Sequence, residues 1–235
     1  MLPDVATLFA PAKLTLSLRV TGIRYDGMHL IDAEMITLDF GDTLEMSAGT
    51  GVEYTGTYDG EGDGSDLVSR ALALVGAQRQ IHVTKRIPPG AGLGGGSSDA
   101  AAILRAAGFD DAAAAARIGA DVAFCLAGGR ARVTGIGELV EPLPYVPTTV
   151  TLLTPPLHCS TPAVYRAWDD MGGPAGDNGN DLEDAAVMVE PKLAVWRDRL
   201  SDHSGRRARL AGSGSTWFVE GAFPGDHMLV ATATR

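Results

Sequence analysis

A glycine-rich segment in the first half of the chain, PPGAGLGGGSSDAA, constrains the fold more than any other feature. Five of the seven residues from 90 to 96 are glycine, and an alanine-rich stretch follows directly. A loop without side chains exposes backbone N–H groups, and the amino end of a helix adds unpaired N–H groups and a positive dipole. The pattern therefore predicts a phosphate site where this loop enters a helix that begins at Ser97 or Ser98.

Two common nucleotide-binding motifs do not account for this loop. Residues 90–95 satisfy G-x-G-x-x-G, but two prolines separate them from the strand predicted at 81–84, and a helix occupies the place of the next strand. No Gly-Lys-Ser/Thr follows, which excludes a Walker A loop. A Rossmann-type oxidoreductase that binds NAD or NADP is thus the remote alternative.

Composition limits the classes of partner. The chain of 235 residues has 29 acidic and 19 basic side chains, which disfavours a binder of nucleic-acid backbones. Two cysteines are too few for a disulfide framework or a four-cysteine zinc site. The first residues lack the basic region of a signal peptide, and no run of about 18 apolar residues occurs. We therefore expect a cytoplasmic protein, monomer or homodimer, that binds small molecules and neither nucleic acid nor a membrane.

The spacing of apolar residues predicts an α+β fold, because strand and helix patterns recur without strict alternation. A cluster of prolines at 142–147 predicts a boundary between two lobes, residues 1–147 and 148–235. The main strands are expected at 14–20, 35–40, 43–47, 81–84, 131–134, 149–154, 217–220 and 229–232, and the helices at 66–76, 97–108, 110–119 and 182–200.

Three motifs in order resemble those of the GHMP kinases: APAKL at 10–14, the glycine-rich segment at 88–101, and LAGSGST at 210–216. Within that superfamily the chain is most similar to the 4-diphosphocytidyl-2-C-methyl-D-erythritol kinases of the non-mevalonate isoprenoid pathway. The segments that carry this closer resemblance are APAKLTLSLRVTGIRYDGMH, FGDTLEM, GADVAFCLAGGRARVTGIGE, STPAVYRAW and NDLE.

The resemblance implies a fold and a reaction. It implies an N-terminal lobe like domain 2 of ribosomal protein S5, a ferredoxin-like C-terminal lobe, and ATP between them. The γ-phosphoryl group of ATP would pass to the 2-hydroxyl of the cytidyl substrate, with Mg²⁺ whose protein ligand stays unassigned. Asp121 matches the family's catalytic aspartate and would accept the hydroxyl proton, while Lys13 would stabilise the carboxylate and orient the hydroxyl.

The resemblance also implies the binding residues. Asp66 stands where the family has a residue near the adenosine, although an aspartate there equally suits a helix N-cap. The second glycine loop would contact phosphate or the substrate's diphosphate, or form a plain turn. The residues expected to bind ATP are Pro88, Gly90, Ala91, Gly92, Leu93, Gly94, Gly95, Gly96, Ser97, Ser98 and Asp66, and those expected to bind substrate are Met28, His29, Asp121, Gly212, Ser213 and Gly214.

Two residues depart from the family's pattern on the substrate side. The family has an aromatic residue that stacks on cytosine where this chain has Met28, next to His29, which would bond the edge of the base. It has a second aromatic residue where this chain has Glu190. A GHMP kinase for another small alcohol is therefore an alternative, as is a nucleotide-binding module without catalysis. Retention of both Lys13 and Asp121 favours an enzyme.

Overall fold

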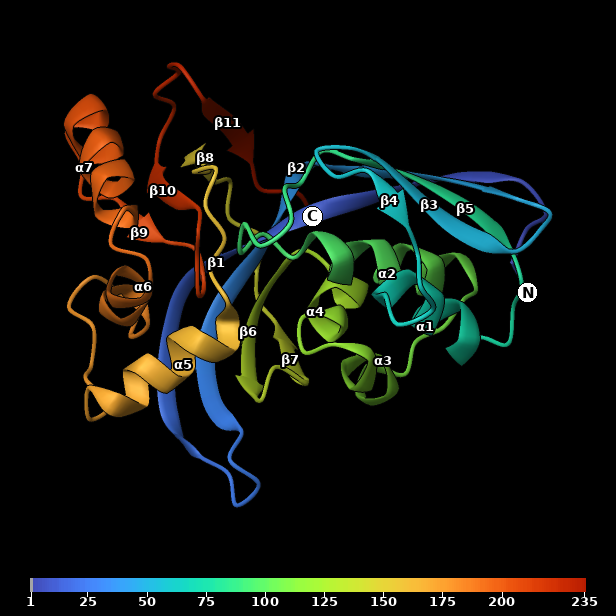
Figure 1. Ribbon diagram of the computed structural model, residues 1–235, viewed down its shortest axis with the longest axis horizontal. Coiled ribbons are helices and arrows are strands. Elements are labelled where there is room, and N and C mark those ends of the chain that lie inside the picture. Colours follow the sequence, from blue (N-terminus) through green and yellow to red (C-terminus); the bar gives the residue numbers. More distant parts are fainter. Residues whose placement is uncertain (1) are drawn as a thin grey trace.

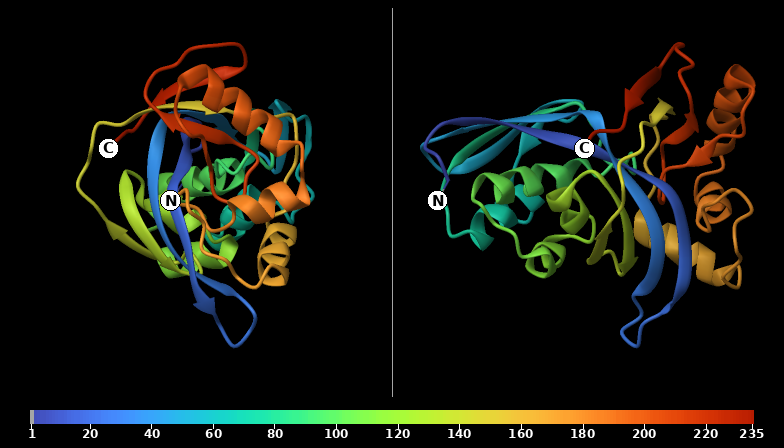
Figure 2. Two further views of the ribbon diagram at one scale, coloured as in Figure 1. Left: turned by 90° about the vertical axis from the view of Figure 1, so that its left-hand side faces the viewer. Right: turned by 180° about the vertical axis from the view of Figure 1, so that it is seen from behind.

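The alternating apolar pattern near the N-terminus forms a long hairpin in the computed structural model, which describes residues 2–235. β1 (Ala6–Ile23) pairs antiparallel with β2 (His29–Ser47), with register shifts that bend the two strands. The strands predicted separately at 35–40 and 43–47 are thus parts of one strand, β2. The tip of this hairpin extends away from the rest of the molecule (Figures 1 and 2).

The hairpin belongs to a seven-stranded sheet in which β2 is central. The strand order is β4-β3-β5-β2-β6-β7, with β1 paired to β2, and every pair except β3–β5 is antiparallel. This arrangement differs from the parallel doubly wound sheet of a dinucleotide-binding fold, so the Rossmann alternative is wrong. The remaining strands are β3 (Gly51–Gly56), β4 (Gly60–Glu61), β5 (Gln80–Lys85), β6 (Arg130–Gly135) and β7 (Leu139–Pro142).

Four helices lie on one side of this sheet, three of them in contact with its strands and the third along the chain packed on two other helices (Figure 1). They are α1 (Leu67–Leu74), α2 (Gly95–Ala106), α3 (Ala112–Ile118) and α4 (Val122–Ala127). Asp66 and Asp111 cap α1 and α3 with their side chains, which confirms two predicted helix starts. α2 begins at Gly95 rather than at a serine, because Gly94 takes the left-handed conformation at its N-cap. α4 was not predicted.

The second half of the chain forms a four-stranded antiparallel sheet with the order β11-β8-β10-β9. The predicted helix over 182–200 is wrong in one respect: two helices occur, because Pro191 cannot donate a backbone hydrogen bond and interrupts the turn after Glu190. The strands are β8 (Thr149–Leu153), β9 (Arg209–Leu210), β10 (Trp217–Glu220) and β11 (Met228–Thr232), and the helices are α5 (Thr161–Asp170), α6 (Glu183–Val189) and α7 (Leu193–Ser204).

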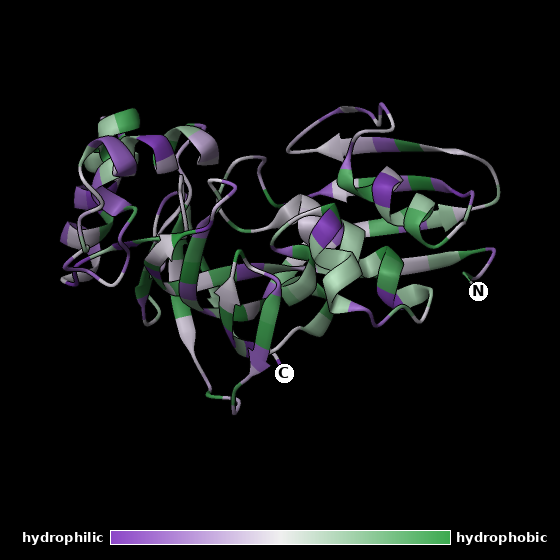
Figure 3. Cartoon of the chain, turned by 90° about the horizontal axis from the view of Figure 1, so that it is seen from below, coloured by the Kyte–Doolittle hydropathy of each residue, from purple (hydrophilic) through white to green (hydrophobic). Residues whose placement is uncertain are grey.

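The apolar core lies between the sheets and their helices, where Phe124, Trp217 and Phe218 are fully buried. Figure 3 shows hydrophobic stretches along the strands and helices in the middle of the molecule. Both cysteines are free and buried, and burial raises the pKa of the Cys125 thiol to about 12. No helix within residues 2–235 has the length and apolarity needed to cross a membrane.

Candidate active site

The glycine loop is held against the second glycine loop by backbone contacts. Gly90 O accepts a hydrogen bond from Ser215 N at 3.2 Å, and Ala91 O accepts one from Thr216 N at 3.1 Å. Gly92 has a φ of 77°, and a Cβ atom there would lie 2.5 Å from the backbone oxygen of Ala211. Only glycine fits this close approach, so the two loops are shaped together.

The first loop borders a pocket of about 330 Å³ in front of the amino end of α2. Asp66 lines this pocket and also caps α1, because its carboxylate accepts a hydrogen bond from Ser69 N at 2.9 Å. The same carboxylate accepts a hydrogen bond from the Tyr54 hydroxyl at 2.9 Å. Backbone N–H groups at a helix start suit phosphates. The pocket is lined by Tyr54, Tyr58, Asp66, Leu67, Val68, Lys85, Ile87, Pro88, Pro89, Gly90, Ala91, Gly92, Leu93, Gly94, Gly95, Gly96 and Asp99.

A buried group of charges supports the loop from below. Lys85 Nζ contacts the carboxylate of Asp42 and lies 2.7 Å from Asp99 Oδ2, and all three residues are buried. A Cβ atom on Gly95 would lie 3.2 Å from Lys85 Nζ. Burial raises the pKa of the Asp99 carboxyl to about 7, against the opposing charge of Lys85. The group ties the start of α2 to β5, which fixes the loop's backbone.

Lys13 and Asp121 form an ion pair beside the loop. Lys13 Nζ lies 3.1 Å from Asp121 Oδ2 and donates to Thr15 Oγ1 at 3.1 Å. Its backbone N–H donates to Leu93 O at 3.0 Å, which fixes β1 to the glycine loop. The lysine side chain is 6% exposed, whereas the aspartate side chain is 32% exposed. The carboxylate of Asp121 can therefore reach a bound molecule while the buried ammonium holds it in place.

A second pocket of about 580 Å³ contains this ion pair. Gly92 and Gly94 line both pockets, so the two spaces meet at the glycine loop. The second pocket is lined by Lys13, Thr15, Leu18, Gly27, Met28, His29, Ile31, Met35, Gly92, Gly94, Ser97, Ala120, Asp121, Ile136, Thr161, Pro162, Tyr165, Arg166, Asp169, Leu182, Gly212 and Ser213.

Three predicted binding residues, Ser97, Ser98 and Gly214, do not line the pocket for which they were predicted. Ser98 is fully buried and donates its hydroxyl to Pro11 O at 2.6 Å, and Ser97 lines the second pocket instead of the first. Gly214 lines neither pocket, and its carbonyl instead lies against Gly92. Glu190 also lies outside the lining, because it ends α6 and its carboxylate accepts from Lys192 N.

The sequence prediction missed the α5 side of the second pocket. Tyr165 and Asp169 lie on one face of α5 and both contact His29. Tyr165 belongs to the STPAVYRAW segment, which carries the resemblance but predicts no role for its side chains, and Asp169 directly follows that segment. In the first pocket, Tyr54 and Lys85 were also missed. Isolated tyrosine and lysine residues on strands give no pattern that marks a site.

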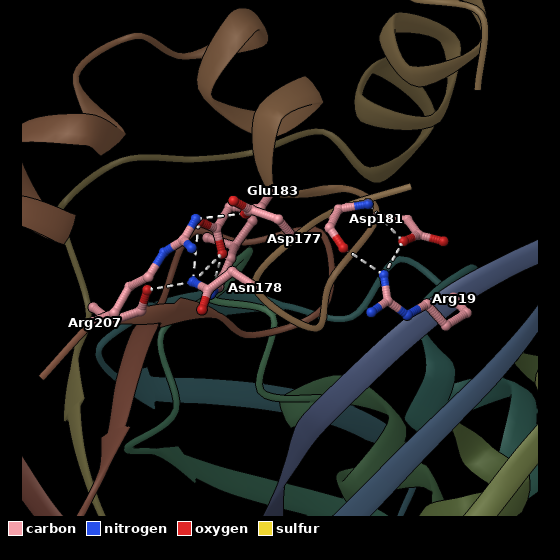
Figure 4. A network of polar contacts seen from close by, with 9 residues as sticks. Arg19, Asp177, Asn178, Asp181, Glu183 and Arg207 are labelled. Carbon is pink, nitrogen blue, oxygen red and sulfur yellow. Dashed lines mark hydrogen bonds and ion pairs between the residues drawn. The ribbon is translucent and has the colours of Figure 1, made fainter. Parts of the chain in front are cut away.

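The NDLE segment positions the second glycine loop. The side-chain amide of Asn180 donates to Leu210 O at 2.9 Å and to Gly212 O at 2.7 Å, and its oxygen accepts from Leu182 N. Around it, Asp181 pairs with Arg19 of β1 at 2.6 Å, and Asn178 bonds the carboxylate of Glu183 (Figure 4). These contacts join β1 to the region that carries Gly212 and Ser213.

Within residues 2–235 no group of three or more histidine, cysteine, aspartate or glutamate side chains is placed to hold a metal ion. Mg²⁺ at phosphoryl-transfer sites keeps several waters and binds through substrate phosphates with one or two carboxylates.

Comparisons with known proteins identify the relatives of this chain. A family model for the N-terminal domain of GHMP kinases matches residues 66–129, which include the glycine loop and Asp121. A 4-diphosphocytidyl-2-C-methyl-D-erythritol kinase of Ruegeria pomeroyi is 37% identical, with 93% of this chain and 88% of that protein covered. One from Paracoccus denitrificans is 36% identical, with 89% and 84% covered. A crystal structure of 4-(cytidine 5'-diphospho)-2C-methyl-D-erythritol kinase matches with a TM-score of 0.78 and 32% identity, covering 97% of this chain and 98% of that one.

Proposed function

The chain belongs to the family of 4-diphosphocytidyl-2-C-methyl-D-erythritol kinases, and we propose that it phosphorylates the 2-hydroxyl of 4-diphosphocytidyl-2-C-methyl-D-erythritol with ATP in isoprenoid precursor synthesis. The observation that carries the proposal is the position of the ion pair between Lys13 and Asp121. It lies in the second pocket, beside the glycines that this pocket shares with the first. A hydroxyl bound there would face phosphates bound at the loop.

The proposed reaction uses each member of the pair differently. The Asp121 carboxylate would accept the proton of the attacking hydroxyl, whose oxygen forms the new bond to the γ-phosphorus. The bond from that phosphorus to the β–γ bridging oxygen breaks, and ADP leaves with the electron pair. Lys13 would hold the carboxylate in position and offer positive charge to the transferring oxygens.

ATP would occupy the first pocket. The backbone of Gly90, Gly92 and Gly94 to Gly96 would receive the phosphates, with the dipole of α2 behind them. Pro88, Ala91 and Leu93 shape the wall. Asp66 borders the pocket through its cap on α1, next to Tyr54 and Tyr58, where a nucleobase would lie. Mg²⁺ would be held chiefly by the phosphates and would neutralise their charge, and we assign it no protein ligand.

The alcohol substrate would occupy the second pocket. Met28 and His29 would receive the cytosine, and Gly212, which lies near Lys13, would receive the diphosphate together with Ser213 of the same lining. Gly214 would not contact the substrate but would shape the second glycine loop, whose backbone packs against Gly92. A phosphoryl acceptor placed between these residues would lie beside Asp121. This assignment is part of the proposal, as is a cytoplasmic enzyme, monomer or homodimer, whose two lobes are residues 1–147 and 148–235.

A second candidate is a GHMP kinase for a different small alcohol. The part of the second pocket around Met28 and His29 would receive the base, and we call it the base end. The observation that favours this candidate is that Met28 stands there in place of the family's stacking aromatic residue, while Glu190 lies outside the lining. Stacking of a base on an aromatic side chain contributes about 1–3 kcal/mol, so its loss weakens selection for cytidine.

A panel of acceptors distinguishes the two candidates. ADP formation would be measured with ATP and Mg²⁺ against 4-diphosphocytidyl-2-C-methyl-D-erythritol, mevalonate, phosphomevalonate and homoserine. We expect turnover with the cytidyl substrate alone. Turnover with another alcohol and none with the cytidyl substrate would replace the first candidate by the second.

A further inference from the structure

His29 is held from several sides at the base end of the second pocket. Its Nε2 atom lies 2.8 Å from Asp169 Oδ1, and its ring stacks on Tyr165 with centroids 4.5 Å apart and an interplanar angle of 29°. Trp168 approaches the ring edge at a centroid distance of 5.8 Å. His29 starts β2, while all three partners lie on α5. The ring therefore has one orientation, set by elements far apart in the sequence.

The partner of Nε2 determines the chemistry of the other ring nitrogen. An ionised carboxylate only accepts hydrogen bonds, so Asp169 requires a hydrogen atom on Nε2. In a neutral imidazole the remaining nitrogen, Nδ1, then carries a lone pair and is an acceptor. Nδ1 makes no hydrogen bond to any residue within 2–235, whereas the side chain lines the pocket. It is thus available to a bound molecule.

We infer that Asp169 is a positioning residue that keeps the hydrogen of His29 on Nε2, so that Nδ1 accepts a hydrogen bond from the exocyclic amino group of cytosine. The inference rests on the proposed function, because it takes the cytidine of that substrate as the ligand. A uracil base carries a carbonyl oxygen at the same position, and its lone pairs would face the lone pair of Nδ1. The pair His29–Asp169 therefore selects cytidine against uridine.

Because this chain lacks the family's two aromatic residues at the base end, hydrogen bonding contributes a larger share of the selection between bases. Met28 is 46% exposed and offers a thioether in place of an aromatic face. Glu190 lies outside the pocket lining. Because a site built around a hydrogen bond discriminates against an analogue that cannot form it, the loss of the Asp169 contact has a measurable effect on base choice.

The first test compares two substrates in two variants. Asp169→Asn keeps the size of the side chain, but its amide can donate to Nε2 as well as accept from it, so both tautomers become possible. The control is Asp170→Asn, a neighbouring exposed aspartate on α5 without a side-chain contact among residues 2–235. Turnover would be measured with the cytidyl substrate and its uridyl analogue, after thermal unfolding has shown that both variants fold.

We expect Asp169→Asn to lower the ratio of kcat/KM values, cytidyl over uridyl, by about tenfold. The change should fall on KM for the alcohol, with kcat nearly unchanged, and Asp170→Asn should match the wild type. An unchanged ratio in Asp169→Asn would overturn the inference. Absence of turnover by the wild type would instead contradict the proposed function, and the inference would then be decided by the second test.

The second test reads the tautomer directly from ¹⁵N chemical shifts of the imidazole nitrogens by NMR, without substrate. In the wild type we expect the shift of a protonated Nε2 and of an unprotonated Nδ1 at pH 7.5. In Asp169→Asn we expect both shifts to move toward intermediate values, and in Asp170→Asn no change. A wild-type ring with hydrogen on Nδ1, alone or on both nitrogens, would overturn the inference.

Discussion

The phosphate pocket and the base end of the substrate pocket are built in opposite ways. The first is a continuous segment of backbone, residues 88–96, at the start of one helix. The second is made of side chains from β2 and α5, which approach only in the folded chain. A backbone site depends on glycine at fixed positions, whereas a side-chain site can exchange partners. This difference explains why the loop keeps its family pattern while Met28 departs from it.

The largest expected effect lies where the two regions meet. Asp121→Asn removes the proposed proton acceptor, and we expect kcat to fall by about 10³-fold while the Kd for ATP stays within twofold. The exposed Asp110→Asn, 11 residues earlier, is the control and should retain full activity. Steady-state kinetics and titration calorimetry measure the two quantities. A kcat within tenfold of the wild type would show that the two pockets are not joined by catalysis at Asp121.

The second largest effect is expected from a change in the glycine loop of the phosphate pocket. Gly92→Ala forces a Cβ atom to within 2.5 Å of Ala211 O at a φ of 77°, so the two glycine loops must separate. We expect ATP affinity to fall by more than about tenfold, with a loss of about 2 kcal/mol in unfolding free energy. Gly22→Ala, where the nearest atom lies 3.9 Å away, should change neither quantity. Unaltered ATP affinity in Gly92→Ala would place the phosphates elsewhere.

A smaller effect is expected for a variant that changes binding in the substrate pocket and leaves binding in the phosphate pocket unchanged. Asn180→Ala removes the donor to Leu210 O and Gly212 O, and the loss should lower the unfolding free energy by about 1–3 kcal/mol. Because Gly212 lines only the substrate pocket, we expect KM for the alcohol to rise about tenfold, with KM for ATP within twofold. Asn178→Ala, which breaks a contact with Glu183 in the same network, should lower stability without this rise. Equal changes in both KM values would show that the pockets respond as one.

The smallest effect would restore the family residue at the base end. Met28→Tyr places an aromatic face where the side chain is 46% exposed and lines the pocket. We expect KM for the cytidyl substrate to fall about threefold to tenfold, since base stacking on an aromatic side chain is favourable. Met188→Tyr, at an exposed position outside the pocket, is the control. A rise in KM would show that the base does not lie against residue 28.

The same contrast describes what the sequence could predict. The phosphate loop, its helix, the cap Asp66 and the start of the helix predicted at 110–119 follow from local chemistry, so their positions could be predicted to within a few residues. The contact of Lys13 with Asp121 was expected only through the resemblance, because nothing local links residues 108 positions apart.

Contacts between distant segments could not be predicted. Lys85 is bound by Asp42 and Asp99 because β2, β5 and α2 bring them together, and no spacing in the chain indicates that. Tyr165 and Asp169 contact His29 for the same reason. Ser98 looked like a phosphate ligand, but the helix starts earlier than predicted and the hydroxyl is used by Pro11 O.

The most direct test follows the phosphoryl group itself. ³¹P NMR of a reaction with ATP, Mg²⁺ and 4-diphosphocytidyl-2-C-methyl-D-erythritol reports every phosphorus atom in substrates and products. We expect one new phosphomonoester signal, in an amount equal to the ADP formed, with the diphosphate of the substrate intact. Consumption of ATP to free phosphate without a phosphomonoester, or no reaction at all, would contradict transfer between the two pockets.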